Sequence, residues 1–189
     1  TIYDENVQAQ LDAITDEDAR QKALLEAQYE QWRNKAISDP YEPGSVFKII
    51  TASSVLEEKV VSLNHSFTCT GAYESGGVTY HCWKLAGHGT QNFAQTLQNS
   101  CNPAFISYGQ ALGKEKFREY FQAFGLTQTT GIDLPGEAGS IYHTEEDFGI
   151  TELSSSSFGQ TFKVTALQLI TAVSAAVNGG ELMQPYVVK

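Results

Sequence analysis

The sequence is poor in cysteine, in positive charge and in long hydrophobic runs, and each shortage excludes a class of protein. Three cysteines among 189 residues are too few for a disulfide scaffold. Twelve Lys and Arg against 22 Asp and Glu give a formal net charge of -10, and the basic residues form no stripe, so nucleic acid is not expected as a partner. The longest apolar stretch, residues 164–177, is too short to span a membrane and is interrupted by polar residues.

What remains is enough for a folded domain. The chain is 41% hydrophobic, which supplies a core for one large domain or for part of a larger one. No positively charged and apolar signal peptide opens the sequence, and this leaves the compartment of the parent protein open. Reading at periods of 20 to 50 residues reveals no internal repeat.

The three cysteines and two nearby histidines admit several interpretations. An odd count leaves at least one thiol without an internal partner, and a disulfide between Cys69 and Cys82 is one possibility in an oxidising compartment. A metal site of His81, Cys82 and His88 is disfavoured, because the sequence has no CxxC or HxxxH pair. Cys101 is interpreted as a residue that fills space, since a redox role requires an accessible thiol of low pKa.

Apolar periodicity and turn residues predict a mainly helical chain. Residues 4–36 are rich in Ala, Leu, Glu and Gln and predict a polar-surfaced helix or helix pair, which a turn at 40–44 separates from the rest. Glycines and aromatics between 60 and 89 indicate loops and a short hairpin. The serine-rich segment 154–162 is interpreted as a strand that leads into a last helix ending at 178–180. Further helices are expected at 45–58, 91–99, 103–112 and 114–124.

Ser45 and Lys48 lie one helical turn apart at the start of the predicted helix 45–58. Serine is a poor nucleophile unless a base lies beside it, and lysine is a base only when its neutral form is accessible. Burial and the positive end of a helix dipole both favour that neutral form. Helix capping explains Ser45 equally well, so the SxxK spacing alone leaves both interpretations open.

A second polar pair, Ser100 and Asn102, occurs in the segment QNSCNPAF. Asn102 followed by Pro103 has the pattern of a helix N-cap with proline at the first helical position. The pair also falls in a short loop between two predicted helices, where both side chains are able to point into a cleft beside Ser45. The pattern favours neither interpretation over the other.

Longer segments carry a family resemblance that covers most of residues 32–189. They are WRNKAISDPYEPGSVFKIITASSVLEE, GHGTQNFAQTLQNSCNPAFI, FGLTQTTGIDLPGE and SFGQTFKVTALQLITAVSAAVNGG. In order and spacing they resemble the transpeptidase domain of class B penicillin-binding proteins, whose relatives share SxxK, Ser-x-Asn and Lys-Thr-Gly motifs. The segments HCWKLAGHG and QNSCNPAF are most similar to those of Gram-positive division or sporulation members of this class.

The resemblance implies an α+β fold of the penicillin-binding protein and β-lactamase type. We expect a fragment dominated by the helical subdomain, with a helical lead-in at 1–36 and a partial transpeptidase domain at 37–189. No Lys-Thr-Gly, Lys-Ser-Gly or His-Thr-Gly occurs in the sequence. In the family that motif lies on a strand beside the nucleophile, so it is expected beyond Lys189, and this chain alone is expected to be impaired. The resemblance places a membrane anchor and a non-catalytic domain upstream.

The resemblance also implies a reaction. Ser45 would attack the penultimate D-alanine of a peptidoglycan stem peptide, and Lys48 would accept the serine proton. Ser100 would relay a proton to the leaving amine, and Asn102 would hold a substrate amide and help to place Lys48. The backbone N–H of Ser45 would be one oxyanion donor. An amine of a neighbouring stem would then resolve the acyl-enzyme, and β-lactams would acylate the same serine.

The partners implied are stem peptides, β-lactams and other cell-wall synthesis proteins, at the extracytoplasmic face of the bacterial cell membrane. No metal or organic cofactor is implied. Two other functions remain as alternatives. A serine β-lactamase shares the SxxK chemistry but adds fast deacylation, and a β-lactam sensor or other non-catalytic penicillin-recognising domain would bind without turnover.

Overall fold

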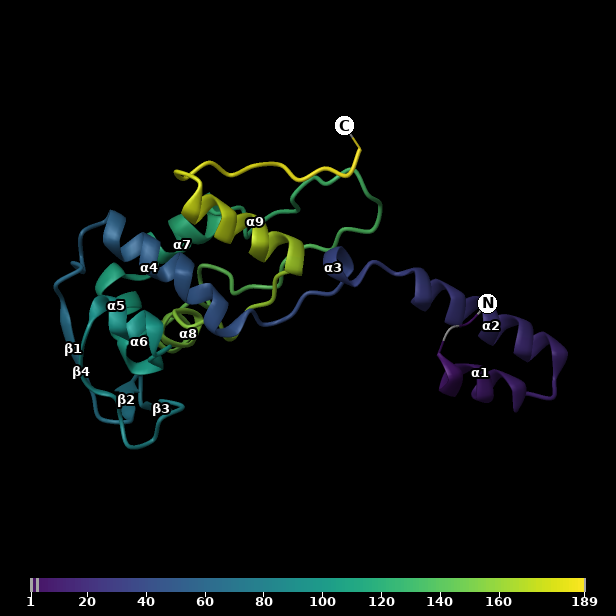
Figure 1. Ribbon diagram of the computed structural model, residues 1–189, viewed down its shortest axis with the longest axis horizontal. Coiled ribbons are helices and arrows are strands. Elements are labelled where there is room, and N and C mark those ends of the chain that lie inside the picture. The colour runs from purple at the N-terminus through teal and green to yellow at the C-terminus, as the bar shows by residue number, and fades with distance from the viewer. Residues whose placement is uncertain (1, 3, 189) are drawn as a thin grey trace.

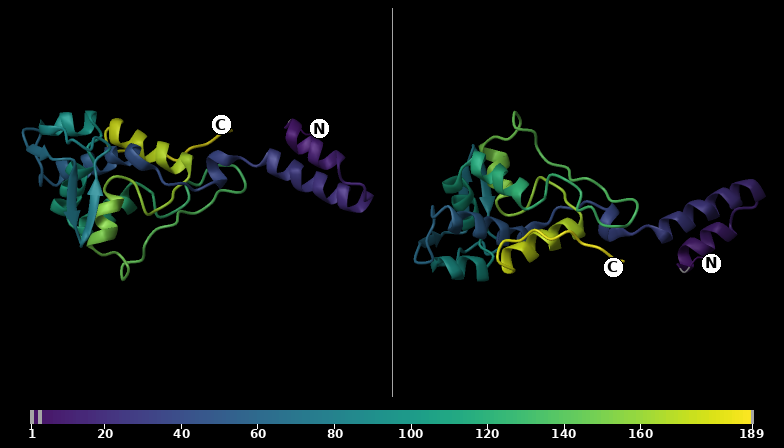
Figure 2. Two further views of the ribbon diagram at one scale, coloured as in Figure 1. Left: turned by 90° about the horizontal axis from the view of Figure 1, so that it is seen from below. Right: turned by 90° about the horizontal axis from the view of Figure 1, so that it is seen from above.

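The computed structural model describes residues 2 and 4–188, and it shows a helical hairpin projecting from a larger body (Figure 1). The hairpin consists of α1 (Glu5–Asp12) and α2 (Glu17–Trp32). Asp4 and Asp16 cap the two helices, because each side chain accepts hydrogen bonds from backbone N–H groups of the first turn. The helix pair expected from the polar segment 4–36 is therefore confirmed. Figure 2 shows the hairpin apart from the body in two further views.

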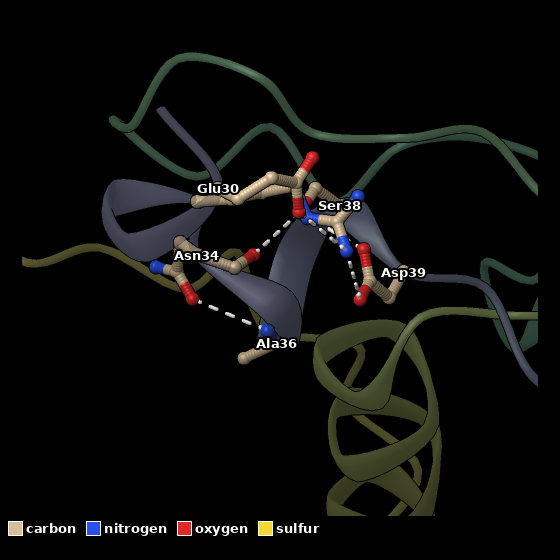
Figure 3. A network of polar contacts seen from close by, with 6 residues as sticks. Glu30, Asn34, Ala36, Ser38 and Asp39 are labelled. Carbon is tan, nitrogen blue, oxygen red and sulfur yellow. Dashed lines mark hydrogen bonds and ion pairs between the residues drawn. The ribbon is translucent and has the colours of Figure 1, made fainter. Parts of the chain in front are cut away.

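A short polar junction connects the hairpin to the body (Figure 3). Arg33 forms ion pairs with Glu30, at 3.5 Å, and with Asp39, at 3.1 Å. The side chain of Asn34 accepts a hydrogen bond from the backbone N–H of Ala36 and so caps α3 (Lys35–Ser38). Exposed ion pairs of this kind contribute at most about 1 kcal/mol each, so the junction orients the chain more than it stabilises it.

The helix expected at 45–58 forms in two pieces. A 3₁₀ turn, η1 (Gly44–Phe47), leads directly into α4 (Lys48–Glu57). The α4 helix runs through the centre of the body, where it packs against α6 and α9. Its side chains Ile50 and Val55 are buried, which accounts for the apolar periodicity of this segment.

Two small antiparallel sheets lie at the end of the body far from the hairpin (Figure 1). The first pairs β1 (Ser66–Cys69) with β4 (Gly89–Asn92), and the second pairs β2 (Ala72–Ser75) with β3 (Val78–His81). Gly76 and Gly77 form the two-residue turn of the β2–β3 hairpin with φ angles of 58° and 78°. A turn with two positive φ angles matches the twist of the strands, so the hairpin expected between 60 and 89 is confirmed.

Five more helices complete the body. Those expected at 91–99, 103–112 and 114–124 are confirmed within a few residues, and the last helix ends at Val177, next to the expected end. In the part of the chain that the structure describes, no helix is both long and apolar enough to cross a membrane. The five helices are α5 (Phe93–Gln98), α6 (Asn102–Leu112), α7 (Lys114–Ala123), α8 (Ile150–Ser156) and α9 (Ala166–Val177).

The strand predicted at 154–162 is wrong, because its first residues belong to the helix α8. The buried hydroxyl groups of Ser154 and Ser157 donate hydrogen bonds to carbonyls four residues earlier, at 2.7 Å and 2.6 Å. Serines that bond within their own helix need no other partner, so a serine-rich segment is able to lie buried as a helix. Beyond the predicted strand, Lys163 forms an isolated β-bridge with Ile141, and Val164 forms one with Tyr41.

An aromatic cluster holds the start of α4 in place. The ring of Phe47 lies 5.9 Å from that of Phe117, 6.1 Å from that of Phe121 and 4.8 Å from that of Phe162. All four rings are buried, and such pairs contribute about 0.5–1.5 kcal/mol each beyond the burial of their surface. Since Phe47 is two residues from Ser45, the cluster restrains the turn that carries this serine.

The turn after α8 supports the same segment from the other side. The backbone N–H of Gly44 donates a hydrogen bond to the carbonyl of Gly159 at 2.8 Å, and Thr51 donates to the carbonyl of Ser157 at 2.9 Å. Gly159 has a φ of 90°, and a Cβ atom at this position would collide with the backbone of Gly44. Glycine is therefore required at 159 by both conformation and space.

We predict that Gly159→Ala lowers the free energy of unfolding by about 2 kcal/mol or more, because the methyl group forces either η1 or the turn at 159 to move. The matched control is Gly139→Ala, since no atom lies within 4 Å of a Cβ built at Gly139 and this glycine does not have a positive φ. Urea unfolding of the two variants and the parent protein measures the effect. Equal midpoints for the two variants would contradict the role given to Gly159.

Candidate active site

The four side chains singled out in the sequence meet around the amine of Lys48, which is only 1% exposed. Lys48 Nζ lies 3.0 Å from Ser45 Oγ, 2.9 Å from Ser100 Oγ and 2.6 Å from Asn102 Oδ1. The carbonyl oxygen of Ser100 is a fourth acceptor, at 3.0 Å. Burial of an amine is tolerated only when such partners surround it, so Lys48 joins α4 to the loop before α6.

Ser45 is exposed at the surface, on the 3₁₀ turn η1 that precedes α4. Its hydroxyl accepts a hydrogen bond from Ser100 Oγ at 2.9 Å, so Ser45, Lys48 and Ser100 form a closed triangle of polar contacts. The capping interpretation of Ser45 is wrong, because neither η1 nor α4 has a side-chain cap. An exposed hydroxyl beside a buried amine has the arrangement of a nucleophile and its base.

Burial lowers the pKa of Lys48 to about 8, while the nearby sulfur atoms of Cys101 and Cys82 oppose this effect. With such a pKa, roughly a tenth of the molecules carry a neutral Lys48 at pH 7, against well under a hundredth for an ordinary lysine. The ring of Phe105, 5.6 Å from Nζ, forms part of the apolar wall. The neutral form of the Lys48 amine is therefore populated near pH 7, which is the condition for a base that the sequence alone left open.

Ser100 reaches the site through an unusual backbone conformation. Its φ of 50° lies in the left-handed region, which non-glycine residues adopt at a cost. The backbone N–H of Cys101 donates to the carbonyl of Thr96 at 3.0 Å and closes the end of α5. This turn directs both the hydroxyl and the carbonyl of Ser100 toward Lys48.

Asn102 does not cap α6, contrary to one of the two interpretations. The helix already includes Asn102, and Cys101 occupies the N-cap position without a side-chain hydrogen bond. The Asn102 amide instead accepts the shortest of the Lys48 contacts. The prediction erred because the N-cap pattern ignores a partner that lies 54 residues away in sequence.

The sulfur atoms near Lys48 were not anticipated from the sequence as part of this environment. All three cysteines are free thiols, so the disulfide considered for Cys69 and Cys82 is not formed. The sequence suggests that Cys101 fills space, yet Cys101 and Cys82 are the two groups that raise the pKa of Lys48. The only signal available in the sequence was the position of Cys101 between Ser100 and Asn102.

Comparison with known proteins identifies the family. The sequence profile of the penicillin-binding protein transpeptidase domain matches residues 2–189. The chain therefore belongs to this family, and its fold is the helix-rich α+β fragment expected from the resemblance.

Two relatives illustrate the relationship. Stage V sporulation protein D of Bacillus subtilis is 48% identical over 158 residues, which are 83% of this chain and 24% of the relative. The peptidoglycan D,D-transpeptidase MrdA of Acinetobacter baumannii is 28% identical over 82% of this chain and 25% of the relative. The chain thus spans about a quarter of the length of these relatives.

Solved structures share the fold. Penicillin-binding protein 3 from Mycobacterium tuberculosis, complexed with aztreonam, has a TM-score of 0.80 and 30% identity over 88% of this chain and 37% of the other. Penicillin-binding protein 2 from Helicobacter pylori, in a complex with MreC, has a TM-score of 0.78 and 26% identity over 90% of this chain and 34% of the other.

We predict that Lys48 titrates near pH 8, because its burial outweighs the effect of the nearby thiols. Proton titration followed by NMR of ¹³C-labelled lysine side chains measures this pKa directly. The Lys48→Met variant assigns the signal, since only the Lys48 resonance should disappear. If every lysine resonance titrates near the ordinary pKa of about 10.4, the buried-amine description is wrong.

Proposed function

We propose that this protein is a peptidoglycan D,D-transpeptidase in which Ser45 is the nucleophile. The observation that carries the proposal is the triangle of Ser45, Lys48 and Ser100, with all three contacts at 2.9–3.0 Å, in a chain of the transpeptidase family. A reactive hydroxyl, a base with lowered pKa and a second hydroxyl able to carry a proton are the groups that acyl transfer needs.

In the first half-reaction Ser45 Oγ attacks the carbonyl carbon of the penultimate D-alanine. Neutral Lys48 accepts the hydroxyl proton as the new C–O bond forms. Lys48 then returns the proton through Ser100 Oγ to the departing nitrogen, and the C–N bond to the terminal D-alanine breaks. The products are an ester on Ser45 and free D-alanine, with Lys48 neutral again.

In the second half-reaction an amine of a neighbouring stem peptide attacks this ester. The same proton path runs in reverse, so that Lys48 receives the amine proton through Ser100 and returns it to Ser45 as the C–O bond breaks. Asn102 accepts a hydrogen bond from Lys48 at 2.6 Å, which supports its role in placing the amine. Its side-chain N–H group is a donor for a substrate amide.

The proposal includes an extracytoplasmic location and other proteins of cell-wall synthesis as partners. The similar protein in a complex with MreC supports the proposal of such partners.

The proposal also places the Lys-Thr-Gly strand and the membrane anchor in the full-length protein. In that arrangement Ser45, now exposed, would be covered by the strand, and the backbone N–H of Ser45 would act with an N–H of the strand on the oxyanion.

We predict that a penicillin forms one covalent adduct on the full-length protein and none on its Ser45→Ala variant, because only Ser45 is both exposed and in contact with Lys48. Intact mass spectrometry measures the adduct. The 189-residue chain alone should react at least about tenfold more slowly, since it lacks one oxyanion donor. A full-length protein that stays unmodified would overturn the assignment of Ser45.

The same experiment, followed over time, separates the alternatives. A transpeptidase releases D-alanine from a stem peptide and transfers the acyl group to an amine. A β-lactamase instead hydrolyses the penicilloyl ester quickly and regenerates the free enzyme. A sensor keeps the adduct and releases no D-alanine. Release of D-alanine that depends on Ser45 therefore supports transpeptidation over both.

We also predict that acylation accelerates about tenfold per pH unit below a pH of about 8 and levels off above it, because the neutral form of Lys48 is the base. The sign follows from the lowered pKa, since protonation of Lys48 at lower pH removes the base. Stopped-flow measurement of acylation with a fluorescent penicillin between pH 6 and 10 tests this. A rate that falls with pH over this range would exclude Lys48 as the base.

A further inference from the structure

Three thiols and one imidazole converge at a single point behind the site. The ligand-capable atoms of Cys69, Cys82, His88 and Cys101 all lie within 4.8 Å of one another. Cys82 Sγ lies 3.4 Å from His88 Nδ1. The three cysteines are 2%, 1% and 0% exposed, so the cluster is shielded from water.

Four atoms at these separations fit a tetrahedral metal ion. With Zn–S bonds of about 2.3 Å and Zn–N bonds of about 2.0–2.1 Å, tetrahedral ligand atoms lie about 3.5–3.8 Å apart. The 3.4 Å between Cys82 Sγ and His88 Nδ1 is close to this spacing, and contraction by about 1 Å brings the widest pair to it. Three sulfurs and one ring nitrogen are a ligand set typical of structural zinc sites.

We propose that Cys69, Cys82, His88 and Cys101 bind one zinc ion. Binding replaces the three thiol protons with three Zn–S bonds and adds a bond from neutral His88 Nδ1, so three protons are released to solvent. The bound group has a net charge of -1, because three thiolates meet one Zn²⁺. This site differs from the combination of His81, Cys82 and His88 that the sequence suggested and disfavoured. His81 is exposed on β3 and takes no part in it.

The backbone around the cluster is arranged for close approach of the ligand-bearing loops. A Cβ atom at Gly87 would collide with the carbonyl oxygen of Cys69, and one at Gly71 would collide with that of Leu85. Glycine at both positions therefore lets the loop after Cys69 and the loop before His88 approach each other closely.

Trp83 contacts both the ring of His88 and the segment next to Cys101. Its ring packs edge-on against His88, with the centroids 5.2 Å apart. Its indole N–H donates a hydrogen bond to the carbonyl of Asn99 at 2.8 Å, next to the loop that carries Ser100 and Cys101. This contact holds the His88 loop against the Cys101 loop. The ring nitrogen of His88 that faces the thiols is Nδ1, which lies 3.4 Å from Cys82 Sγ.

The zinc ion would fix the loop of the active site. Cys101 lies between Ser100 and Asn102, which both contact Lys48, and Ser100 has a left-handed φ of 50°. The ion would tie this strained turn to β1 through Cys69 and to the end of β3 through Cys82. The ion would therefore have a positioning role, because it would hold the segment that carries Ser100 and Asn102 without contacting the reacting atoms.

The test uses full-length protein that has been reduced, freed of metal and kept anaerobic. One equivalent of Co²⁺ should produce the intense absorption of tetrahedral cobalt–thiolate coordination, and Zn²⁺ should abolish it. Metal analysis after zinc loading and gel filtration should give one zinc per chain. Proton release, followed with a pH indicator, should accompany binding. A reduced protein that retains no zinc and gives no cobalt–thiolate absorption overturns the proposal and identifies the cluster as packed free thiols.

His81 and His88, seven residues apart in the segment HCWKLAGH, provide the matched variants. His88→Ala should weaken zinc binding at least about tenfold, whereas His81→Ala should leave it unchanged. His88→Cys should restore binding with a fourth thiolate and stronger cobalt–thiolate absorption. Circular dichroism of the metal-free variants checks that each is folded. Equal affinity of the His81 and His88 variants would contradict the assigned ligand set. Metal binding is read without any activity, so this result is independent of the proposed function.

Discussion

The burial of the Lys48 amine is the constraint on which the rest of the structure depends. An amine in the core is stable only if polar atoms replace the water that it loses, and here four acceptors lie within 3.0 Å of Nζ. Two of the side chains that supply them, Ser100 and Asn102, come from the turn after α5 and the start of α6, more than 50 residues further along the chain. The position of α4 and the conformation of the chain between α5 and α6 are therefore coupled, and burial of the amine lowers its pKa.

Two groups of contacts hold the segments that meet at Lys48. On one side, Phe47 and the aromatic rings around it hold the turn of Ser45, while Gly159 admits the backbone of Gly44 closely enough for a hydrogen bond. On the other side, the end of α5 and the buried Cys101 hold Ser100 in a left-handed conformation. Such local strain persists only where the surroundings enforce it, and it is concentrated here at the candidate site.

Two errors of the sequence analysis have a common cause. The Asn102 amide accepts a hydrogen bond from Lys48, and Cys69 and Cys82 remain free thiols beside Cys101 and His88. In each case a local pattern suggested one partner, and the folded chain supplies another. A polar side chain takes the partner that is nearest in space, which a pattern of neighbouring residues does not reveal.

By itself the sequence determined the features that depend on short range: the helix pair before residue 36, a short hairpin between 60 and 89, and the one-turn spacing of Ser45 and Lys48. The family resemblance in the sequence added the identity of the second motif. Only the tertiary structure decided the distances of Ser100 and Asn102 from Lys48, and that three cysteines and His88 lie close together. Local backbone geometry sets distances within a few residues, whereas contacts between distant segments depend on how the helices pack.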